Sequence, residues 1–229
     1  MHQSTGNFKK ILFYLFSLFF LSSIVNIEFK SINDKSFLIE KIQIISQNKS
    51  LENKLSKQLN YLINQNILLL EKKRIIEKIK SNKIIQDFKV IKKYPSEILI
   101  YAVSTKIIGK TLIEGNLYYI GYNSKLIEDV NQEIPEDLPN IFGKFELDDF
   151  LSLYKELQKN NFENYLITDF YYFENNRWDI KINNGLLIKL PEKNNYQTLK
   201  MVKKLLDNNT FEQKIIDLRV ANQVIISNG

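Results

Sequence analysis

The sequence has 229 residues, of which 44% are apolar and 12% aromatic, enough to build one or two packed cores, and this excludes a disordered chain. Its formal net charge is +6, but the lysines are spread along the chain beside acidic residues, as in Glu71-Lys72-Lys73-Arg74, which is typical of a solvated surface and argues against nucleic-acid binding. The absence of cysteine excludes disulfides, thiolate metal sites and cysteine nucleophiles.

The first predicted element is an apolar helix. Residues 11–27 contain no charged side chain and follow Lys9 and Lys10. As a helix they would extend about 25 Å, so we expect a transmembrane helix at 11–27 after a cytoplasmic tail at 1–10. The positive-inside rule then places the N-terminus in the cytoplasm and the C-terminus in the periplasm. A cleaved signal peptide is the alternative, although no Ala-x-Ala site is present.

The next region, residues 37–105, alternates between strand and helix periodicity. Leucines spaced as in a helix follow Ser50, which we expect to be the N-cap. Tyr94-Pro95-Ser96 predicts a turn because proline cannot donate to a sheet ladder. The predicted elements are a strand at Phe37–Ile45, helices at about Leu51–Leu62 and Leu70–Lys80, and strands at Ile85–Tyr94 and Glu97–Thr105.

Residues 106–229 read as a mostly antiparallel β domain with two helices. Asn and Gly clusters separate short apolar runs, as expected for turns between strands. We expect helices at about Glu146–Gln158 and Tyr196–Asp207, and strands around Ile107-Ile108, Leu117–Tyr122, Lys125–Ile127, Tyr165–Phe173, Trp178–Ile182, Leu186–Leu190, Lys214–Val220 and Val224–Ser227.

The residue types argue against an enzyme. The only histidine is His2, in the predicted cytoplasmic tail, so Ser-His-Asp hydrolysis and conventional zinc sites are excluded from the rest of the chain. Asp148 and Asp149 are a candidate acid/base pair, but the side chains of adjacent residues on a helix point about 100° apart. The helix dipole already explains two acidic residues in the first turn of a helix. No phosphate-binding glycine loop is present. We therefore predict no catalytic residue, no cofactor and no metal.

Two motifs resemble a known family. The order strand, helix, helix, strand, strand is that of a POTRA domain, and FKVIKKYPSEILIYAV resembles the V-x-R-x-[WY]-P-x-x-L-x-I-x-V signature of the bacterial FtsQ/DivIB cell division family. Near the end of the chain, IIDLRVANQVIIS resembles the D-L-R-Y-x-N-G motif of the same family, with Asp217, Leu218, Arg219 and Asn222 matching. Lys92 or Lys93 stands where the family usually has arginine, and Val220 where it usually has tyrosine.

The resemblance implies an α+β fold with an N-terminal transmembrane helix, a POTRA domain (β-α-α-β-β) at 37–105 and a C-terminal β domain at 106–229. It implies an inner-membrane divisome scaffold at the septum that binds FtsB and FtsL and links early division proteins, through the POTRA domain, to septal peptidoglycan synthesis. We expect the edge at Lys214–Ser227 to pair with a strand of FtsB. The expected partner-binding residues are Arg219, Val220, Asn222, Val224 and Ile226.

Two other functions remain open. One is a membrane-anchored POTRA adaptor of envelope transport or assembly, and the weaker one is a carboxylate-dependent cell-wall hydrolase. Capture of FtsB and FtsL homologues would favour the division role, and release of peptidoglycan fragments would favour the hydrolase.

Overall fold

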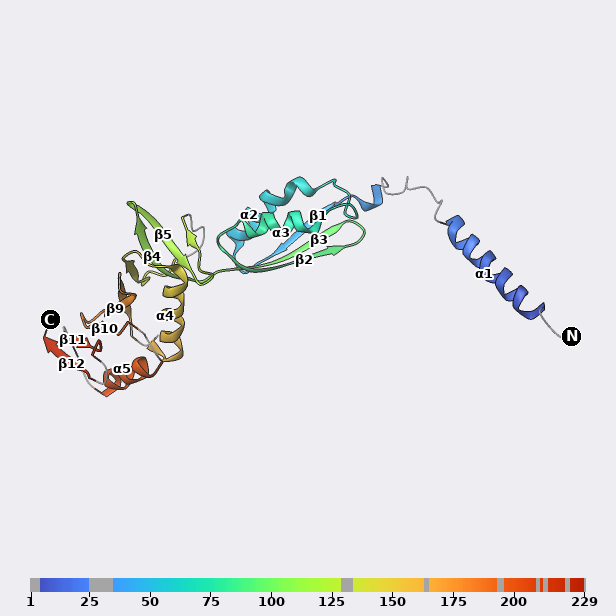
Figure 1. The fold of residues 1–229 in the computed structure, drawn as a ribbon. Helices are drawn as coiled ribbons and strands as arrows, with labels where there is room; N and C mark the ends of the chain where they lie inside the picture. Colours follow the sequence, from blue (N-terminus) through green and yellow to red (C-terminus); the bar gives the residue numbers. More distant parts are fainter. Residues whose placement is uncertain are drawn as a thin grey trace.

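The chain folds into helices and two separate sheets. The computed structural model describes residues 5–24, 35–128, 134–162, 165–192, 196–208, 211, 214–220 and 223–228. Within these residues there are five α-helices, a three-stranded sheet and a nine-stranded sheet (Figure 1). This combination confirms the α+β part of the predicted fold class.

The prediction that the N-terminal helix spans a membrane is wrong. A helix, α1 (Thr5–Ile24), does form, but none of the helices in the described residues is sufficiently long and apolar to cross a membrane. The helix begins before the uncharged run and includes Lys9 and Lys10, so its uncharged part, 11–24, extends only about 21 Å. The hydrocarbon core of a bilayer is about 30 Å thick. Residues 25–27, which we expected to complete the span, lie outside the described residues.

The three-stranded sheet has two helices packed on one face. Its strand order is β1-β3-β2, with β1 parallel and β2 antiparallel to β3. Apolar residues at helical spacing, such as Leu51, Leu55 and Ile75, are buried between the helices and the sheet. The element order agrees with the expected β-α-α-β-β order, and the POTRA boundaries 37–105 stay a prediction. The elements are β1 (Lys41–Ile45), α2 (Lys49–Leu59), η3 (Asn60–Leu62), α3 (Lys72–Lys80), β2 (Ile85–Lys93) and β3 (Glu97–Ser104), preceded by η2 (Lys35–Phe37).

The N-cap of α2 differs from the predicted one, and Lys92 makes contacts that the sequence did not predict. The N-cap of α2 is Asn48 and not Ser50, because the Asn48 side chain accepts a hydrogen bond from the N–H of Leu51 at 3.1 Å. Lys92, one of the two lysines at the family's arginine position, donates from Nζ to the carbonyl oxygens of Ile67 and Leu70 at 2.8 and 2.6 Å. Lys92 thereby holds the loop between α2 and α3 against the sheet.

The nine-stranded sheet is mixed. Its order is β12-β11-β10-β9-β8-β7-β4-β5-β6, with parallel pairs at β10–β11, β7–β8 and β4–β7 and antiparallel pairs elsewhere. The short central strand β7 has no counterpart among the predicted elements. The strands are β4 (Ile107–Ile113), β5 (Asn116–Gly121), β6 (Leu126–Ile127), β7 (Asn140–Phe142), β8 (Ile167–Phe173), β9 (Arg177–Ile182), β10 (Leu187–Lys189), β11 (Lys214–Asp217) and β12 (Ile225–Asn228).

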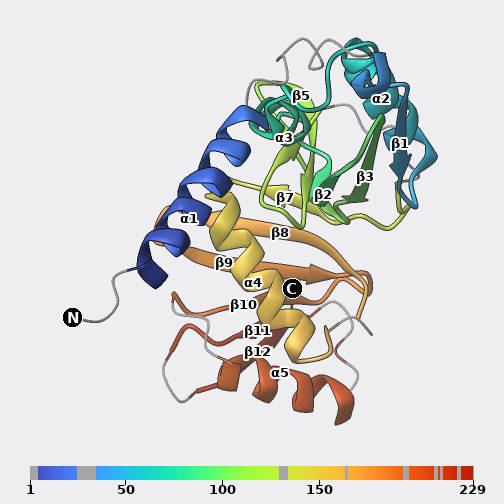
Figure 2. The ribbon, with the colours of Figure 1, turned by 90° about the vertical axis from the view of Figure 1, so that its right-hand side faces the viewer.

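Helices α4 (Leu147–Lys159) and α5 (Tyr196–Asn208) cover one face of this sheet (Figure 2). Phe150 of α4 packs against Phe170 of β8 and Trp178 of β9, with ring centroids 5.2 and 5.8 Å away. Leu199 and Val202 of α5 are fully buried in the same apolar cluster. The sheet therefore has a face covered by helices and an opposite face that carries its charged residues.

Candidate functional site

The last two strands form one edge of the nine-stranded sheet. β11 runs parallel to β10 and antiparallel to β12, with Ile216 opposite Ile226 and Asp217 opposite Ile225. β12 is last in the sheet order, so within the described part of the chain no strand pairs with its outer side. All four β12 residues are exposed. An edge of this kind presents backbone N–H and C=O groups to an incoming strand.

A row of apolar side chains crosses the sheet and ends at this edge. Register pairs place one residue of each strand opposite the next, in the order Ile141, Phe170, Ile180, Ile188, Ile216 and Ile226. The first five are at most 1% exposed, whereas Ile226 is 47% exposed. The row thus stops at an apolar side chain that the described chain leaves half uncovered.

An ion pair lies where β11 ends. The Asp217 carboxylate accepts hydrogen bonds from the Arg219 backbone N–H at 3.0 Å and from its guanidinium at 2.5–3.0 Å. Leu218, between them, is buried, and its N–H donates to the Lys189 carbonyl at 2.9 Å. The two charged side chains therefore share the outer face. The hydrogen bonds from Arg219 hold the pKa of the Asp217 carboxyl below its usual value and raise the pKa of the guanidinium.

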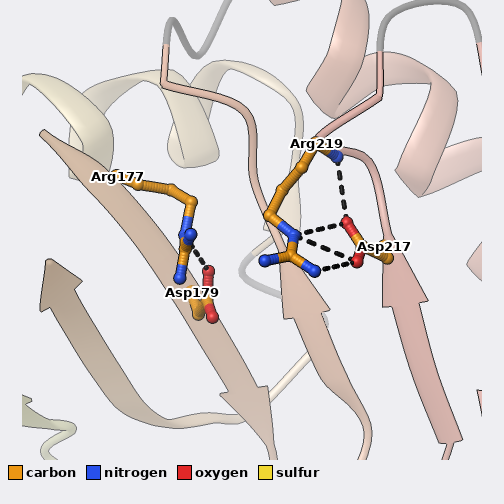
Figure 3. Close-up of polar contacts among 4 residues, drawn as sticks. All are labelled: Arg177, Asp179, Asp217 and Arg219. Carbon is orange, nitrogen blue, oxygen red and sulfur yellow. Dashed lines mark hydrogen bonds and ion pairs between the residues drawn. The ribbon is translucent and has the colours of Figure 1, made fainter. Parts of the chain in front are cut away.

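A second ion pair lies on the same face. Arg177 Nε donates to Asp179 Oδ1 at 3.2 Å, and Asp179 is only 3% exposed. Burial raises the pKa of the Asp179 carboxyl, and the positive charges of Arg177, Lys189 and Arg219 only partly offset this effect. Lys189 stands opposite both Asp179 and Asp217 in the sheet register. Figure 3 shows the two ion pairs next to each other, with the Arg219 guanidinium extending from Asp217 on the side of Asp179.

The structure brings together part of the predicted partner-binding set. Arg219 and Val220 follow β11 and are exposed, and Ile226 lies on β12 and is half exposed. Val224 is partly buried and packs against the main apolar cluster, so it supports the edge from within. Asn222 lies outside the described residues. The predicted strand 214–220 ends at Asp217, which places Arg219 and Val220 in the connection to β12.

Sequence reasoning missed the residues that complete the charged face. Arg177, Asp179 and Lys189 come from β9 and β10, 30 to 42 residues before Arg219 in the sequence. Asp179 alternates with Trp178 and Ile180 on its strand, which is a signal for the outer face. Its nearness to Arg219 depends on the parallel pairing of β10 with β11, which no local pattern encodes.

The candidate acid/base pair of the sequence, Asp148 and Asp149, lies on α4, away from the charged face of the sheet. Asp148 and Asp149 occupy the first turn of α4, where the helix dipole favours negative charge. Asp149 also lines a cavity of about 270 Å³ with Glu156 and Glu192. The part of the chain that the structure describes contains no group of three or more His, Cys, Asp or Glu side chains placed to hold a metal ion. His2 lies outside this part.

Comparison with known proteins gives two matches. A family model described as "Cell division protein FtsQ/DivIB, C-terminal" matches residues 112–219, which contain most of the nine-stranded sheet and end at the Asp217–Arg219 pair. A protein of Bradyrhizobium diazoefficiens named "Cell division protein FtsQ" is 26% identical over 167 residues, which are 70% of this chain and 48% of that protein. The match therefore spans about half the length of this relative.

Proposed function

Because the chain belongs to the FtsQ/DivIB family of cell division proteins, we propose that it is a non-catalytic docking protein of the division machinery whose β12 edge pairs with a strand of FtsB. FtsL is recruited together with FtsB in this proposal, and the protein acts at the division septum. The predicted single-pass topology is not part of the proposal, because it depended on the transmembrane helix.

The exposed, uncharged β12 edge is the observation that carries the proposal. Its residues, Ile225–Asn228, have no charged side chain, and the apolar row ends there at Ile226. An added strand would continue the main-chain ladder and would cover Ile226 if it placed an apolar residue opposite. Arg219 and Asp217, beside the edge, would favour a partner with charged or polar groups next to that strand.

The other sheet edges are less suited to strand addition. β6 has only two residues, and β2 carries Lys89, Lys92 and Lys93 and a register shift near its start. Lysines and bulges on an edge strand discourage pairing with other chains. β1, with five residues and a single lysine, is the nearest competitor.

Proline substitutions test the edge. Ile225→Pro and Ile226→Pro each remove one backbone donor, and because the N–H groups of successive residues point to opposite sides of a strand, one of the two loses an outward donor. We expect capture of FtsB and FtsL homologues by the tagged full-length protein to be lost in that variant. Ile226→Ala keeps every donor but removes most of the apolar side chain that the partner would cover, so it should weaken capture without abolishing it. Gln43→Pro alters the competing β1 edge and should retain capture. Trp178 fluorescence checks that each variant is folded.

Two results would contradict this edge. Capture that survives in both folded proline variants would exclude β12 pairing. Loss of capture in a folded Gln43→Pro variant alone would move the site to β1.

We also propose that the region 37–105 recruits the protein to the division site through earlier division proteins. A fluorescent fusion of the full chain should form bands at mid-cell, and deletion of 37–105 should disperse them. Since this deletion also uncovers apolar residues of the neighbouring sheet, the deleted protein must first be shown to bind FtsB. Unchanged bands in that protein would contradict the recruitment role.

A further inference from the structure

Asn123 makes two hydrogen bonds between the two sheets. Asn123 lies in the turn between β5 and β6 of the nine-stranded sheet. Its Nδ2 donates to the carbonyl oxygens of Lys83 and Ile85 at 2.9 and 3.0 Å, at the beginning of β2 in the three-stranded sheet. Both protons of this amide group are thus used on the other side of the junction. No other side-chain amide in the described residues makes two such bonds across the junction.

Thr105, in the two-residue connection between β3 and β4, makes hydrogen bonds to residues on both sides of the same junction. Its N–H donates to the Ile84 carbonyl at 2.8 Å, and its hydroxyl donates to Gln86 Oε1 at 2.9 Å while accepting from the Asn123 N–H at 3.2 Å. Thr105 is 2% exposed. The turn of the nine-stranded sheet, the connection and β2 therefore share one buried network.

Gly121 allows this close approach. A Cβ atom at position 121 would lie 2.4 Å from Asn123 Oδ1 and 2.8 Å from Thr105 Cγ2, distances that van der Waals radii forbid. Any side chain at this position would push Asn123 and Thr105 apart. The glycine is thus explained by the junction and not by its own backbone angle.

The apolar core also crosses the junction. Ile107, Ile127 and Leu138, which belong to or flank the nine-stranded sheet, are buried in the same cluster as the core of the three-stranded sheet. Rotation of one sheet against the other would expose these side chains and break the Asn123 hydrogen bonds. Exposing the apolar side chains and breaking the hydrogen bonds would each cost free energy.

We propose that this junction makes the two sheets one rigid body, with Asn123 as the positioning residue that sets the angle between them. The connection itself, residues 105–106, is too short to act as a flexible linker but would still permit rotation if the lateral contacts were absent. The proposal of a fixed angle between the two sheets does not depend on the proposed function. Its functional consequence rests on that function: if the β12 edge and region 37–105 both bind division proteins, the two partners are held at a fixed separation.

Distances between spin labels test the proposal. Since the chain has no cysteine, Lys73→Cys on α3 and Lys200→Cys on α5 place one label on each side of the junction, and both positions are exposed. In the full chain we expect one narrow distance distribution by double electron–electron resonance. Asn123→Ala should lose this single peak and give a broad distribution. Lys83→Met removes the exposed Lys83–Glu128 ion pair (3.1 Å) at the same junction and should leave the peak unchanged.

Different results would overturn the rigid body and the role of Asn123. A broad or two-peaked distribution in the protein without any junction substitution overturns the proposal, whether or not the Asn123 variant folds. A narrow, unshifted peak in a folded Asn123→Ala variant overturns the role of Asn123. Capture of FtsB is measured on the same samples, so loss of rigidity and loss of docking are distinguished.

Discussion

The Asp217–Arg219 pair shows how one residue's environment sets its chemistry. Asp217 is the last residue of β11, and its carboxylate receives hydrogen bonds from both the backbone and the guanidinium of Arg219. Asp179, one strand beyond Lys189, is more deeply buried and its pKa moves in the opposite direction. The two carboxylates should therefore affect stability with opposite dependence on pH.

Asparagine variants test these two effects. The folded pKa of Asp217 is below its unfolded value, so its stabilising contribution is present above about pH 4 and is lost as the pH falls through the folded pKa. Asp217→Asn should lower the free energy of unfolding at pH 7 and flatten its decline in acid. The folded pKa of Asp179 is raised, so stability is lost as the pH rises from about 4 through that pKa, and Asp179→Asn should remove this loss.

Urea unfolding at a series of pH values from about 2 to about 7, roughly the range in which carboxylates titrate, gives the free energy of unfolding as a function of pH for each variant. If the free energy of unfolding depended on pH in the same way in both variants, the opposite pKa shifts of Asp217 and Asp179 would be contradicted.

The residue types at these positions were predictable, but their grouping was not. Asp217, Leu218 and Arg219 stand together in the sequence, and their motif indicated a binding edge. Arg177 and Asp179 carry no such signal, because alternation on β9 shows only which face they occupy. Their proximity to Arg219 arises from strand order.

At the scale of elements, helix α2 shows why boundaries are hard to predict. Leucine spacing identified the helix, but both Asn48 and Ser50 are good N-cap residues. The structure selects Asn48, so the helix begins at Lys49 and Ser50 lies within its first turn. A cap depends on the backbone angles before the helix, and these are set by the exit of the chain from β1.

Alanine substitutions distinguish the two caps. Asn48→Ala removes the acceptor for the Leu51 N–H and should lower the free energy of unfolding by about 1 kcal/mol. Ser50→Ala should change it by less than about 0.5 kcal/mol. Urea midpoints at pH 7 measure the difference. A larger loss for Ser50→Ala than for Asn48→Ala would show that the helix begins later in solution.

Helix α1 is an element whose predicted role, to span a membrane, was wrong. Hydropathy located an apolar helix correctly, but the helix extends backward over Lys9 and Lys10, and its described uncharged part is too short to span a bilayer. The last three residues of the predicted span, 25–27, lie outside the described residues.

At the scale of the whole molecule, the two sheets share part of one core. Ile127 belongs to the nine-stranded sheet by hydrogen bonding but is buried with the core of the three-stranded sheet. The single tryptophan, Trp178, lies in the other core and reports on the nine-stranded sheet alone. This separation allows the coupling between the two sheets to be measured.

We expect the chain to unfold as one unit. Thermal curves followed by Trp178 fluorescence and by far-UV circular dichroism should coincide. Ile127→Ala should lower the free energy of unfolding by about 3 kcal/mol and shift both curves equally. Ile113→Ala, at a position 40% exposed, should cost less than about 1 kcal/mol. If Ile127→Ala shifted the circular dichroism curve but not the fluorescence curve, the two sheets would be independent units.

The sequence by itself determined most of the helices and strands, the turns marked by glycine, asparagine and proline, and the family motif at Asp217–Arg219, because periodicity and turn chemistry act between near neighbours in the chain. Only the tertiary structure decided that β12 is the outer strand of the edge expected at Lys214–Ser227, that Asp179 and Lys189 lie beside the Asp217–Arg219 pair, and that Asn123 joins the two sheets. These features depend on strand order and register, which arise from contacts between residues far apart in sequence.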